Sequence, residues 1–306
     1  MKVNKVVSIF LFLIPVFVFQ SCTKQGPDSD QQVYPILFSN LETRAIAVDA
    51  DIQTNGFKAY AFYSVNGTSH NFDGNVKYDS QNTVWSFEDP KYWILGADFY
   101  FRSFYPKALT AGTLTVNNAT SAQSFNITDF DITKQEDVMT ASATETVPDN
   151  KFCPDDGSIV DLHFEHLLAC VEIHIKSEVD GVMVNSISLV NISNGGSYNG
   201  SSWSASSNNA SVDCQSGIRL TKGDDFVDVT NGGFLVIPGV NSGRTLNISA
   251  SNKDYNGVVI PGGTWEIGKK YIYTLTIKQS DIIFVDQSPY VNEWDSESAT
   301  GSVIIK

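Results

Sequence analysis

The sequence is poor in basic residues. Lysine and arginine number 20 against 34 aspartates and glutamates, which gives a formal net charge of −14 at pH 7. Proteins bind nucleic acids and anionic lipid headgroups through clusters of Lys and Arg that neutralise phosphate groups. The acidic balance therefore argues against a nucleic-acid partner and against membrane binding through a basic patch.

Cysteine is also scarce, with only Cys22, Cys153, Cys170 and Cys214 in the whole chain. No Cys-x-x-Cys spacing occurs, so the sequence signals neither a zinc knuckle nor a dithiol redox pair. The three cysteines other than Cys22 allow at most one disulfide. Cys170 lies in an apolar run and is interpreted as a small buried hydrophobic residue.

Long hydrophobic runs are absent except at the N-terminus, where Lys2 and Lys5 precede the apolar run 6–19. Pro15 interrupts this run, which is shorter than the roughly 20 residues that span a bilayer. The pattern is typical of a secretory signal peptide rather than of a permanent transmembrane helix.

The apolar run ends in Phe-Gln-Ser-Cys, a lipobox, which predicts a signal peptide over residues 1–21 and lipidation of Cys22. Residues 22–32 are polar and predict a flexible tether. A diacylglycerol on the thiol and a second acyl chain, such as palmitate, on the new amino group would hold the protein stably, because two chains anchor where one does not. We expect a surface-exposed lipoprotein of the cell outer membrane.

Helical periodicity is missing from the remaining sequence, and only residues 134–144 are compatible with a short helix or an irregular loop. Alternating apolar and polar residues between turn formers predict strands instead. The predicted strands are Val33–Ser39, Phe57–Val65, Phe99–Tyr105, Leu162–Lys176, Val184–Val190, Phe234–Ile237, Leu246–Ala250, Tyr271–Lys278, Ile282–Val285 and Val303–Ile305. The fold class is all-β, with strand spacing typical of sandwiches.

Turn formers and two prolines gather between residues 147 and 158, which indicates a domain boundary. We therefore predict an N-terminal β-sandwich domain over residues 33–150 and a C-terminal β-sandwich domain over residues 151–306. Each part holds enough predicted strands to close two packed sheets.

Histidine offers the strongest-looking chemical constellation, with His163, His166 and His174 close to Glu165. On a strand, however, His163 and His166 point to opposite faces, so a shared metal is not predicted. The acidic pairs lie beside glycine in turn-like contexts without EF-hand spacing. The sequence contains no His-Glu-x-x-His, nucleophile elbow or phosphate-binding glycine loop. We predict no catalytic residues, no metal and no cofactor, hence a protein that is not an enzyme.

The tryptophans leave an alternative open. Aromatic rings on an exposed platform would stack on sugars and favour a surface glycan-binding lipoprotein that does not polymerise, whereas buried rings would only pack the sandwich. The exposure of the side chains discriminates between these interpretations. The tryptophans are Trp85, Trp93, Trp203, Trp265 and Trp294.

Several motifs, in their order along the chain, resemble the fimbrillin-like (Mfa-like) family of lipoprotein pilins and adhesins, the subunits of type V pili. Beside the lipobox they are Thr43-Arg44-Ala45, Trp85 and Trp93 before the run 99–106, Gln135-Glu136-Asp137-Val138-Met139, the run Leu162–Ala169, Leu235-Val236-Ile237-Pro238 and the run Trp265–Tyr273. Gly239 departs from the glutamine that often follows the Leu-Val-Ile-Pro-like strand end in that family.

The resemblance implies two tandem transthyretin-like β-sandwich domains and assembly by donor-strand exchange. In that scheme a protease cuts after an arginine, matched in position by Arg44, and removes the first strand; a neighbour's terminal strand then fills the groove. The protein would be a stalk, anchor or tip subunit of a fimbrium with other fimbrial subunits as partners, acting in adhesion to a host or bacterial surface ligand. The donor-strand candidates are Ile282, Ile283, Phe284, Val285, Val303, Ile304 and Ile305. Alternatively, these strands complete their own sandwich and the protein stays monomeric.

Overall fold

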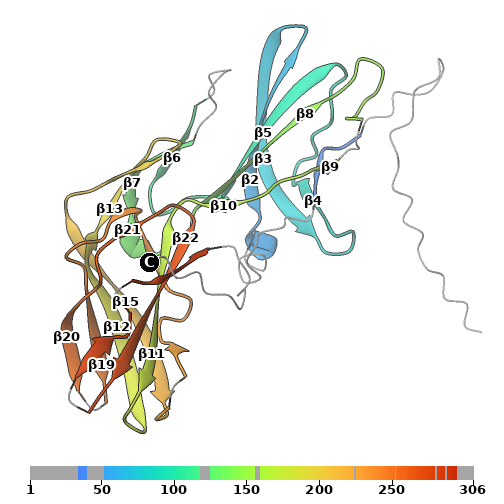
Figure 1. Cartoon of the computed structure of the whole chain (residues 1–306). Coiled ribbons are helices and arrows are strands. Elements are labelled where there is room, and N and C mark those ends of the chain that lie inside the picture. The colour runs from blue at the N-terminus through green and yellow to red at the C-terminus, as the bar shows by residue number, and fades with distance from the viewer. Residues whose placement is uncertain are drawn as a thin grey trace, which may run out of the picture.

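The computed structural model describes residues 34–39, 52–117, 125–155, 159–223, 225–251, 253–279, 281–286 and 288–294. Within these ranges the protein is built almost wholly of strands, and the all-β prediction is confirmed (Figure 1). The exceptions are one helical turn at residues 52–55 and the 3₁₀ turn η1, Ile132–Lys134. In the described ranges, no helix has the length and apolar character needed to cross a membrane.

One large sheet contains eight strands in the order β10-β8-β5-β2-β3-β4-β1-β9. All neighbouring strands are antiparallel except β1 and β9, which run parallel. The strands are β1 (Leu37–Phe38), β2 (Phe57–Val65), β3 (Thr68–Asp79), β4 (Val84–Phe87), β5 (Ala97–Tyr105), β8 (Met139–Thr146), β9 (Ile159–Val160) and β10 (Glu165–His166).

Alternation along these strands builds an aromatic core on one face of the sheet. In β2, Phe57, Ala59 and Ala61 are fully buried, and Phe99 and Phe101 of β5 lie beside them. Small residues on one strand leave space for the rings of its neighbours, so bulky and small side chains interdigitate at native density. The period of two in the sequence thus corresponds to a core face and an outer face.

The second half of the chain contributes two further sheets. The first has the order β16-β11-β22-β23, with β17 also paired to β11 and β24 to β22; the second has the order β15-β12-β19-β20. The strands are β11 (Ala169–Ser177), β12 (Val182–Ser193), β15 (Asn209–Leu220), β16 (Val227–Asp228), β17 (Phe234–Val236), β19 (Thr245–Ala250), β20 (Asp254–Val259), β22 (Lys269–Ile277), β23 (Ile282–Phe284) and β24 (Tyr290–Glu293). A short pair, β18 (Gly239–Val240) and β21 (Thr264–Trp265), accompanies them.

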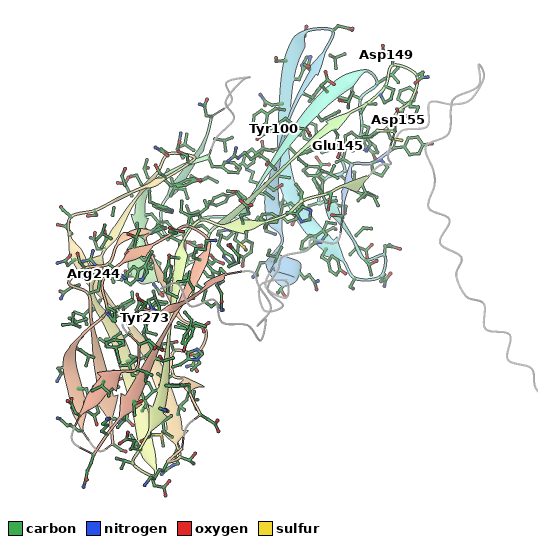
Figure 2. The ribbon with its side chains drawn as sticks, viewed as in Figure 1. Tyr100, Glu145, Asp149, Asp155, Arg244 and Tyr273 are labelled. Atoms are coloured by element: carbon green, nitrogen blue, oxygen red, sulfur yellow. The ribbon has the colours of Figure 1, made fainter. Side chains whose placement is uncertain are left out.

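Apolar side chains of both sheets share a second core. A polar centre lies inside it at Tyr273, which Figure 2 labels. The Tyr273 hydroxyl accepts hydrogen bonds from Asn241 Nδ2 at 3.0 Å and from Trp265 Nε1 at 3.1 Å. Burial raises the pKa of Tyr273 to about 12. A buried hydroxyl with two donors is satisfied, so this group fixes the local packing without leaving an unpaired polar atom.

The chain passes between the two cores more than once. Strands β6 (Thr113–Val116) and β7 (Phe125–Asp131) form a sheet with β13 (Gly195–Tyr198) and β14 (Trp203–Ala205), and Phe125 and Ile127 belong to the second core. The chain then returns through β8, β9 and β10 to the first sheet. Val147 and Cys153, inside the segment where the sequence indicates a boundary, pack in the first core. The division into domains 33–150 and 151–306, and their transthyretin-like topology, stay predictions.

One expected element is wrong. Residues 134–144 form neither a short helix nor an irregular loop throughout, because η1 ends at Lys134 and β8 begins at Met139. Met139 and Ala141 fill inward positions of the first core, so tertiary packing decides the conformation where local propensity is weak.

Candidate strand-exchange site

The first strand supplies buried side chains at alternate positions. Tyr34, Ile36 and Phe38 are buried, with exposed fractions of 8%, 1% and 0%. Leu37 lies between them and is only half-buried. The strand is therefore seated in the first core along one face, as the predicted strand at 33–39 requires; residue 33 lies outside the described ranges.

Backbone hydrogen bonds hold the strand on both sides. Ile36 N donates to Lys91 O at 2.8 Å, and Trp93 N donates to Tyr34 O at 3.1 Å. On the other side Ser39 N donates to Val160 O at 2.8 Å. Strand β1 thus has β4 and the segment that ends at Trp93 on one side, and β9 on the other. Its loss would leave unpaired edges on both sides.

Phe38 is the deepest anchor of this strand. Its ring makes edge-on contacts with the rings of Phe57, Phe87 and Phe101, at centroid distances of 5.8, 5.4 and 5.8 Å. Edge-to-face pairs add to the free energy gained from burial alone. Withdrawal of β1 would expose an aromatic trough, and any strand that replaced it would need a large apolar side chain at this position.

A side-chain contact closes the end of the strand. Ser39 Oγ donates to Asp161 Oδ1 at 2.7 Å. This hydrogen bond, together with the nearby His163, lowers the pKa of Asp161 against a partial opposing effect of burial. The contact ties the exit of β1 to the segment that follows β9.

Cys22 and Arg44 lie outside the described residues, as do the donor-strand candidates Val303, Ile304 and Ile305. Their proposed roles in lipidation, maturation and strand donation remain predictions from the sequence.

The other donor-strand candidates lie on their own second sheet. Ile282, Ile283 and Phe284 form β23, which pairs antiparallel with Leu275–Ile277 of β22. Ile282 is buried, whereas Ile283 and Val285 are 40% and 45% exposed. Further along, β24 pairs with the start of β22, an element that the sequence analysis missed. The described part of the C-terminal segment is therefore folded back along one edge of β22.

The histidines are separated, as their strand positions indicated. His163 is exposed beside Asp161, with Nε2 at 3.1 Å from Oδ2. His166 is buried, with Nδ1 at 3.0 Å from Asp137 Oδ1. His174 lies elsewhere, with Nε2 at 3.0 Å from Glu172 Oε2. Each of the three thus lies beside a different carboxylate.

Glu172, His174 and Asp228 form a group whose possible metal-ligating atoms lie within 4.8 Å of one another. This group is not predictable from the sequence, because Asp228 comes from a distant strand, β16, that sheet pairing brings to β11. Lys270 Nζ forms a salt bridge with Glu172 Oε1 at 2.9 Å. Burial opposes the charge of Glu172, but hydrogen bonds from His174 and Lys270 outweigh burial and lower its pKa. The ammonium already neutralises this carboxylate, so we interpret the group as an ion-pair network.

The tryptophans do not form an exposed platform. Trp85, Trp93, Trp265 and Trp294 are buried, with exposed fractions of 1%, 3%, 3% and 8%. Trp203 is half-buried and donates from Nε1 to Leu167 O at 2.6 Å. The glycan-binding alternative required exposed tryptophans, and the burial of these side chains therefore does not support it.

Cys170 and Cys214 are free thiols. Cys170 is fully buried, and burial raises its pKa to about 12. Because the thiolate is the reactive form, Cys170 is inert, as expected of a small buried hydrophobic residue.

Comparisons with known proteins agree with this architecture. A fimbrial protein from Bacteroides vulgatus is similar at 16% identity and a TM-score of 0.55, covering 86% of this chain and 100% of its own. A candidate cell adhesion protein from Bacteroides ovatus is similar at 14% identity and a TM-score of 0.54, covering 88% and 100%. No curated protein matches the sequence. The sequence profile of the fimbrillin-like family matches residues 43–294, well over half of the 306 residues, and the chain therefore belongs to the fimbrillin-like family.

Proposed function

We propose that this protein is a surface fimbrial subunit, or an accessory adhesin of a fimbrium, that joins its neighbours by donor-strand exchange and acts in cell adhesion. The observation that carries the proposal is the seating of β1. Phe38 is fully buried among three phenylalanine rings, yet its strand is short and lies between two separate edges. Such a strand is replaceable by another of the same pattern, because backbone pairing is independent of sequence and the pockets select alternate side chains.

The trough that β1 fills would also give a joint between subunits its strength. Side chains of the size of Ile36 and Phe38 contribute roughly 1.5–3 kcal/mol each when fully buried. Each backbone hydrogen bond adds a net of about 1 kcal/mol. A neighbour's strand that filled the trough would gain both contributions and would resist mechanical load, as a filament needs.

In this proposal the precursor reaches the cell outer membrane as a lipoprotein acylated at Cys22, and cleavage after Arg44 frees the first strand. Arg44 is the only Lys or Arg between Lys24 and Lys58, so a protease specific for basic residues has one target there. The role is structural, not catalytic. The partners are other fimbrial subunits and a surface ligand.

The replacing strand comes from the C-terminal segment of another copy or of a related subunit. Ile283 and Val285 are exposed at alternate positions, while Ile282 faces its own core. Release of β23 from β22 would therefore expose one buried side chain, that of Ile282, and would break the backbone hydrogen bonds of a short strand pair. The run Val303–Ile305 is the second donor candidate. A tip or anchor subunit would keep its C-terminal strands on its own sandwich and would stay monomeric.

The test is to cleave the purified protein after Arg44 and to follow its mass and oligomeric state. We expect the fragment that carries β1 to dissociate and oligomers to form, and we expect both events to disappear when Arg44→Gln blocks the cut. A second variant, shortened after residue 281, should release β1 but form no oligomers. If the cut protein keeps its first strand, or if oligomers form without residues 282–306, donor-strand exchange is wrong for this chain.

Lipidation has its own test. Cys22→Ala should abolish fatty-acid labelling in cells and should move the protein from the membrane fraction to the soluble fraction, whereas Ser21→Ala should change neither. Unchanged labelling of Cys22→Ala would contradict the anchor.

A further inference from the structure

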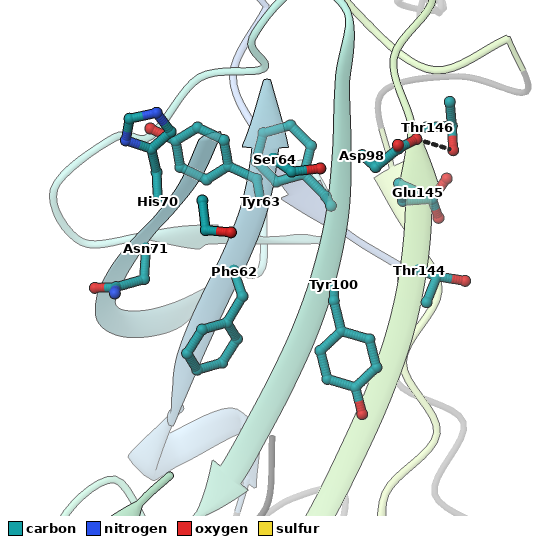
Figure 3. Close-up of a pocket in the computed structure, with 12 residues that line it drawn as sticks. Phe62, Tyr63, Ser64, His70, Asn71, Asp98, Tyr100, Thr144, Glu145 and Thr146 are labelled. Atoms are coloured by element: carbon teal, nitrogen blue, oxygen red, sulfur yellow. Dashed lines mark hydrogen bonds between the residues drawn. The ribbon is translucent and has the colours of Figure 1, made fainter. Parts of the chain in front are cut away.

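The outer face of the eight-stranded sheet carries a row of aromatic and polar side chains across four strands. Strand register places Asn71 opposite Phe62, Phe62 opposite Tyr100 and Tyr100 opposite Thr144. Residues in register on neighbouring strands project from the same face of a sheet. Figure 3 shows Phe62 and Tyr100 on neighbouring strands, with Asn71 and Thr144 on the flanks.

The next row towards the strand ends is entirely polar. It places Ser69 opposite Ser64, Ser64 opposite Asp98 and Asp98 opposite Thr146. Thr146 Oγ1 donates to Asp98 Oδ1 at 2.9 Å, which leaves the second carboxylate oxygen and the hydroxyl lone pairs as acceptors (Figure 3). Two aromatic rings thus adjoin a row of hydroxyl and carboxylate groups.

These rows line a cavity of about 550 Å³. The volume falls within the range of roughly 300–1,000 Å³ that is typical of small-molecule sites. Phe62 is only 6% exposed, yet it belongs to neither hydrophobic core. A large apolar side chain on the outer face, outside both cores, forms the floor of the cavity, and the half-buried Tyr100 stands beside it (Figure 3).

The charge of the cavity is negative. Asp98 presents its carboxylate on the outer face, whereas Glu145 stands opposite the core residue Phe99 and projects from the other face. No lysine or arginine is among the described lining residues. The guanidinium of Arg102 donates to Tyr100 Oη at 3.5 Å and lies over the ring of Phe125 at 5.2 Å. Anionic ligands such as phosphates, sialylated glycans and uronic acids would meet the Asp98 carboxylate, with no lysine or arginine among the described lining residues to offset the repulsion.

We propose that this cavity binds a neutral saccharide. One face of a pyranose ring presents C–H groups that would lie on the half-buried ring of Tyr100, beside the almost fully covered Phe62, and its hydroxyls both donate and accept hydrogen bonds. Asn71 and Thr144 offer donors and acceptors at the flanks of the aromatic pair, and Asp98 offers acceptors above it. The combination of an apolar floor with a few placed polar groups is the general composition of a small-ligand site.

A peptide strand is a poorer occupant of this face. Strands β2 and β5, which carry Phe62 and Tyr100, are paired on both sides beside the cavity. Their backbone groups are already used, so addition of a strand is excluded there. The saccharide would be recognised by side chains alone. This inference rests on the adhesive role of the proposed function, but not on donor-strand exchange.

Binding should be measured on the purified, uncut protein, so that assembly does not enter the result. The probes are immobilised neutral oligosaccharides of hexoses and N-acetylhexosamines, with sialylated and uronic-acid oligosaccharides for comparison. We expect at least one neutral probe to bind and the anionic probes not to bind.

Two substitutions at exposed strand threonines form a matched pair. Thr144→Arg places a long cation beside Tyr100, whereas Thr115→Arg places it on β6, outside the cavity. We expect Thr144→Arg to weaken neutral-saccharide binding by about tenfold or more, and Thr115→Arg to leave it unchanged. Asn71→Ala, also at an exposed position, should weaken it by a smaller factor. Melting temperatures near that of the parent protein would show that the variants fold.

Three results would overturn the saccharide site: no neutral probe binds, an anionic probe binds better, or folded Thr144→Arg and Asn71→Ala variants bind like the parent. Strand exchange after cleavage at Arg44 would still be observed in each case if the proposed assembly is right. The two proposals therefore fail separately.

Discussion

The indole of Trp294 lies flat on the imidazole of His166, with ring centroids 3.7 Å apart and 8° between the ring planes. His166 belongs to β10 of the eight-stranded sheet, while Trp294 follows β24 at the C-terminal end of the described chain and packs in the second core. Trp294 N also donates to Gly268 O at 2.9 Å. The stack therefore fastens the folded-back C-terminal segment to the place where the two cores meet.

Trp294→Ala should destabilise the protein by about 3–5 kcal/mol, the usual cost of truncating a buried tryptophan. Trp294→Phe should retain most of the stability, because a smaller ring still covers His166. Urea unfolding followed by tyrosine fluorescence and circular dichroism measures both variants. Equal midpoints for Trp294→Ala and the parent protein would show that the stack does not hold the segment.

Phe38→Ala should lower the stability of the first core by about 3–5 kcal/mol, because the cavity would lie among three rings that have little freedom to collapse. Leu37→Ala, on the neighbouring outward position of the same strand, should cost clearly less. Thermal melting compares the two variants. A similar loss for both would contradict the assignment of Phe38 as the anchor of β1.

Strands with a long apolar alternation were predictable from the sequence, whereas β4, β7 and β8 were not, although they also carry core residues. Strand β2 has the predicted bounds, because its alternation of apolar residues persists over its length. Strand β3 was missed, since most of its side chains in Thr68–Asp79 are exposed and polar, and its conformation is imposed by pairing with β2. Strand β24 was missed because Tyr290–Glu293 is only four residues long, and its conformation is imposed by pairing with β22.

The candidate sites were predictable only in part. An apolar alternating run between a tether and Arg44 was enough to predict which strand would be exchanged. The cavity on the outer face depends on register between four strands, and no local pattern in the sequence records which residues stand opposite Phe62.

The motif Gln135-Glu136-Asp137 illustrates this limit. Its three side chains contact three distant segments. Gln135 forms hydrogen bonds with the backbone of Leu235, and Glu136 accepts a hydrogen bond from the backbone N–H of Ala111 at 2.6 Å. Asp137 lies within hydrogen-bond distance of the ring of His166. The sequence identifies the motif as similar to that of a family, but only the structure gives its role in fastening the chain between the two cores.

Stability should depend on pH through Glu172. Burial disfavours its charged form, but its hydrogen bonds with His174 and Lys270 lower its pKa below the ordinary value of 4.5. A carboxyl group with a lowered pKa in the folded state stabilises the protein above its unfolded pKa, and this contribution is lost as the pH falls through the folded pKa.

The melting temperature of the parent protein should therefore fall between about pH 5 and pH 3, and part of this decrease should be absent in Glu172→Gln. Glu178→Gln is the matched control, because Glu178 is exposed and lies 3.9 Å from Lys278. An identical decrease in all three proteins would contradict the role of Glu172.

Gln135 acts as a substitute for a neighbouring strand. Its Nε2 donates to Leu235 O at 3.0 Å, and its Oε1 accepts from Leu235 N at 2.9 Å, so one side-chain amide pairs with both backbone groups of a β17 residue. Gln135→Ala should cost about 1–2 kcal/mol, because two partly buried backbone groups lose their partner. Gln135→Glu should not restore the loss, since a carboxylate accepts from Leu235 N but cannot donate to Leu235 O. Melting temperatures of both variants, compared with Gln53→Ala at an exposed position, measure the effect. If Gln135→Glu melts like the parent protein, the donor half of this pairing contributes nothing, and the motif fastens the cores through Glu136 and Asp137 alone.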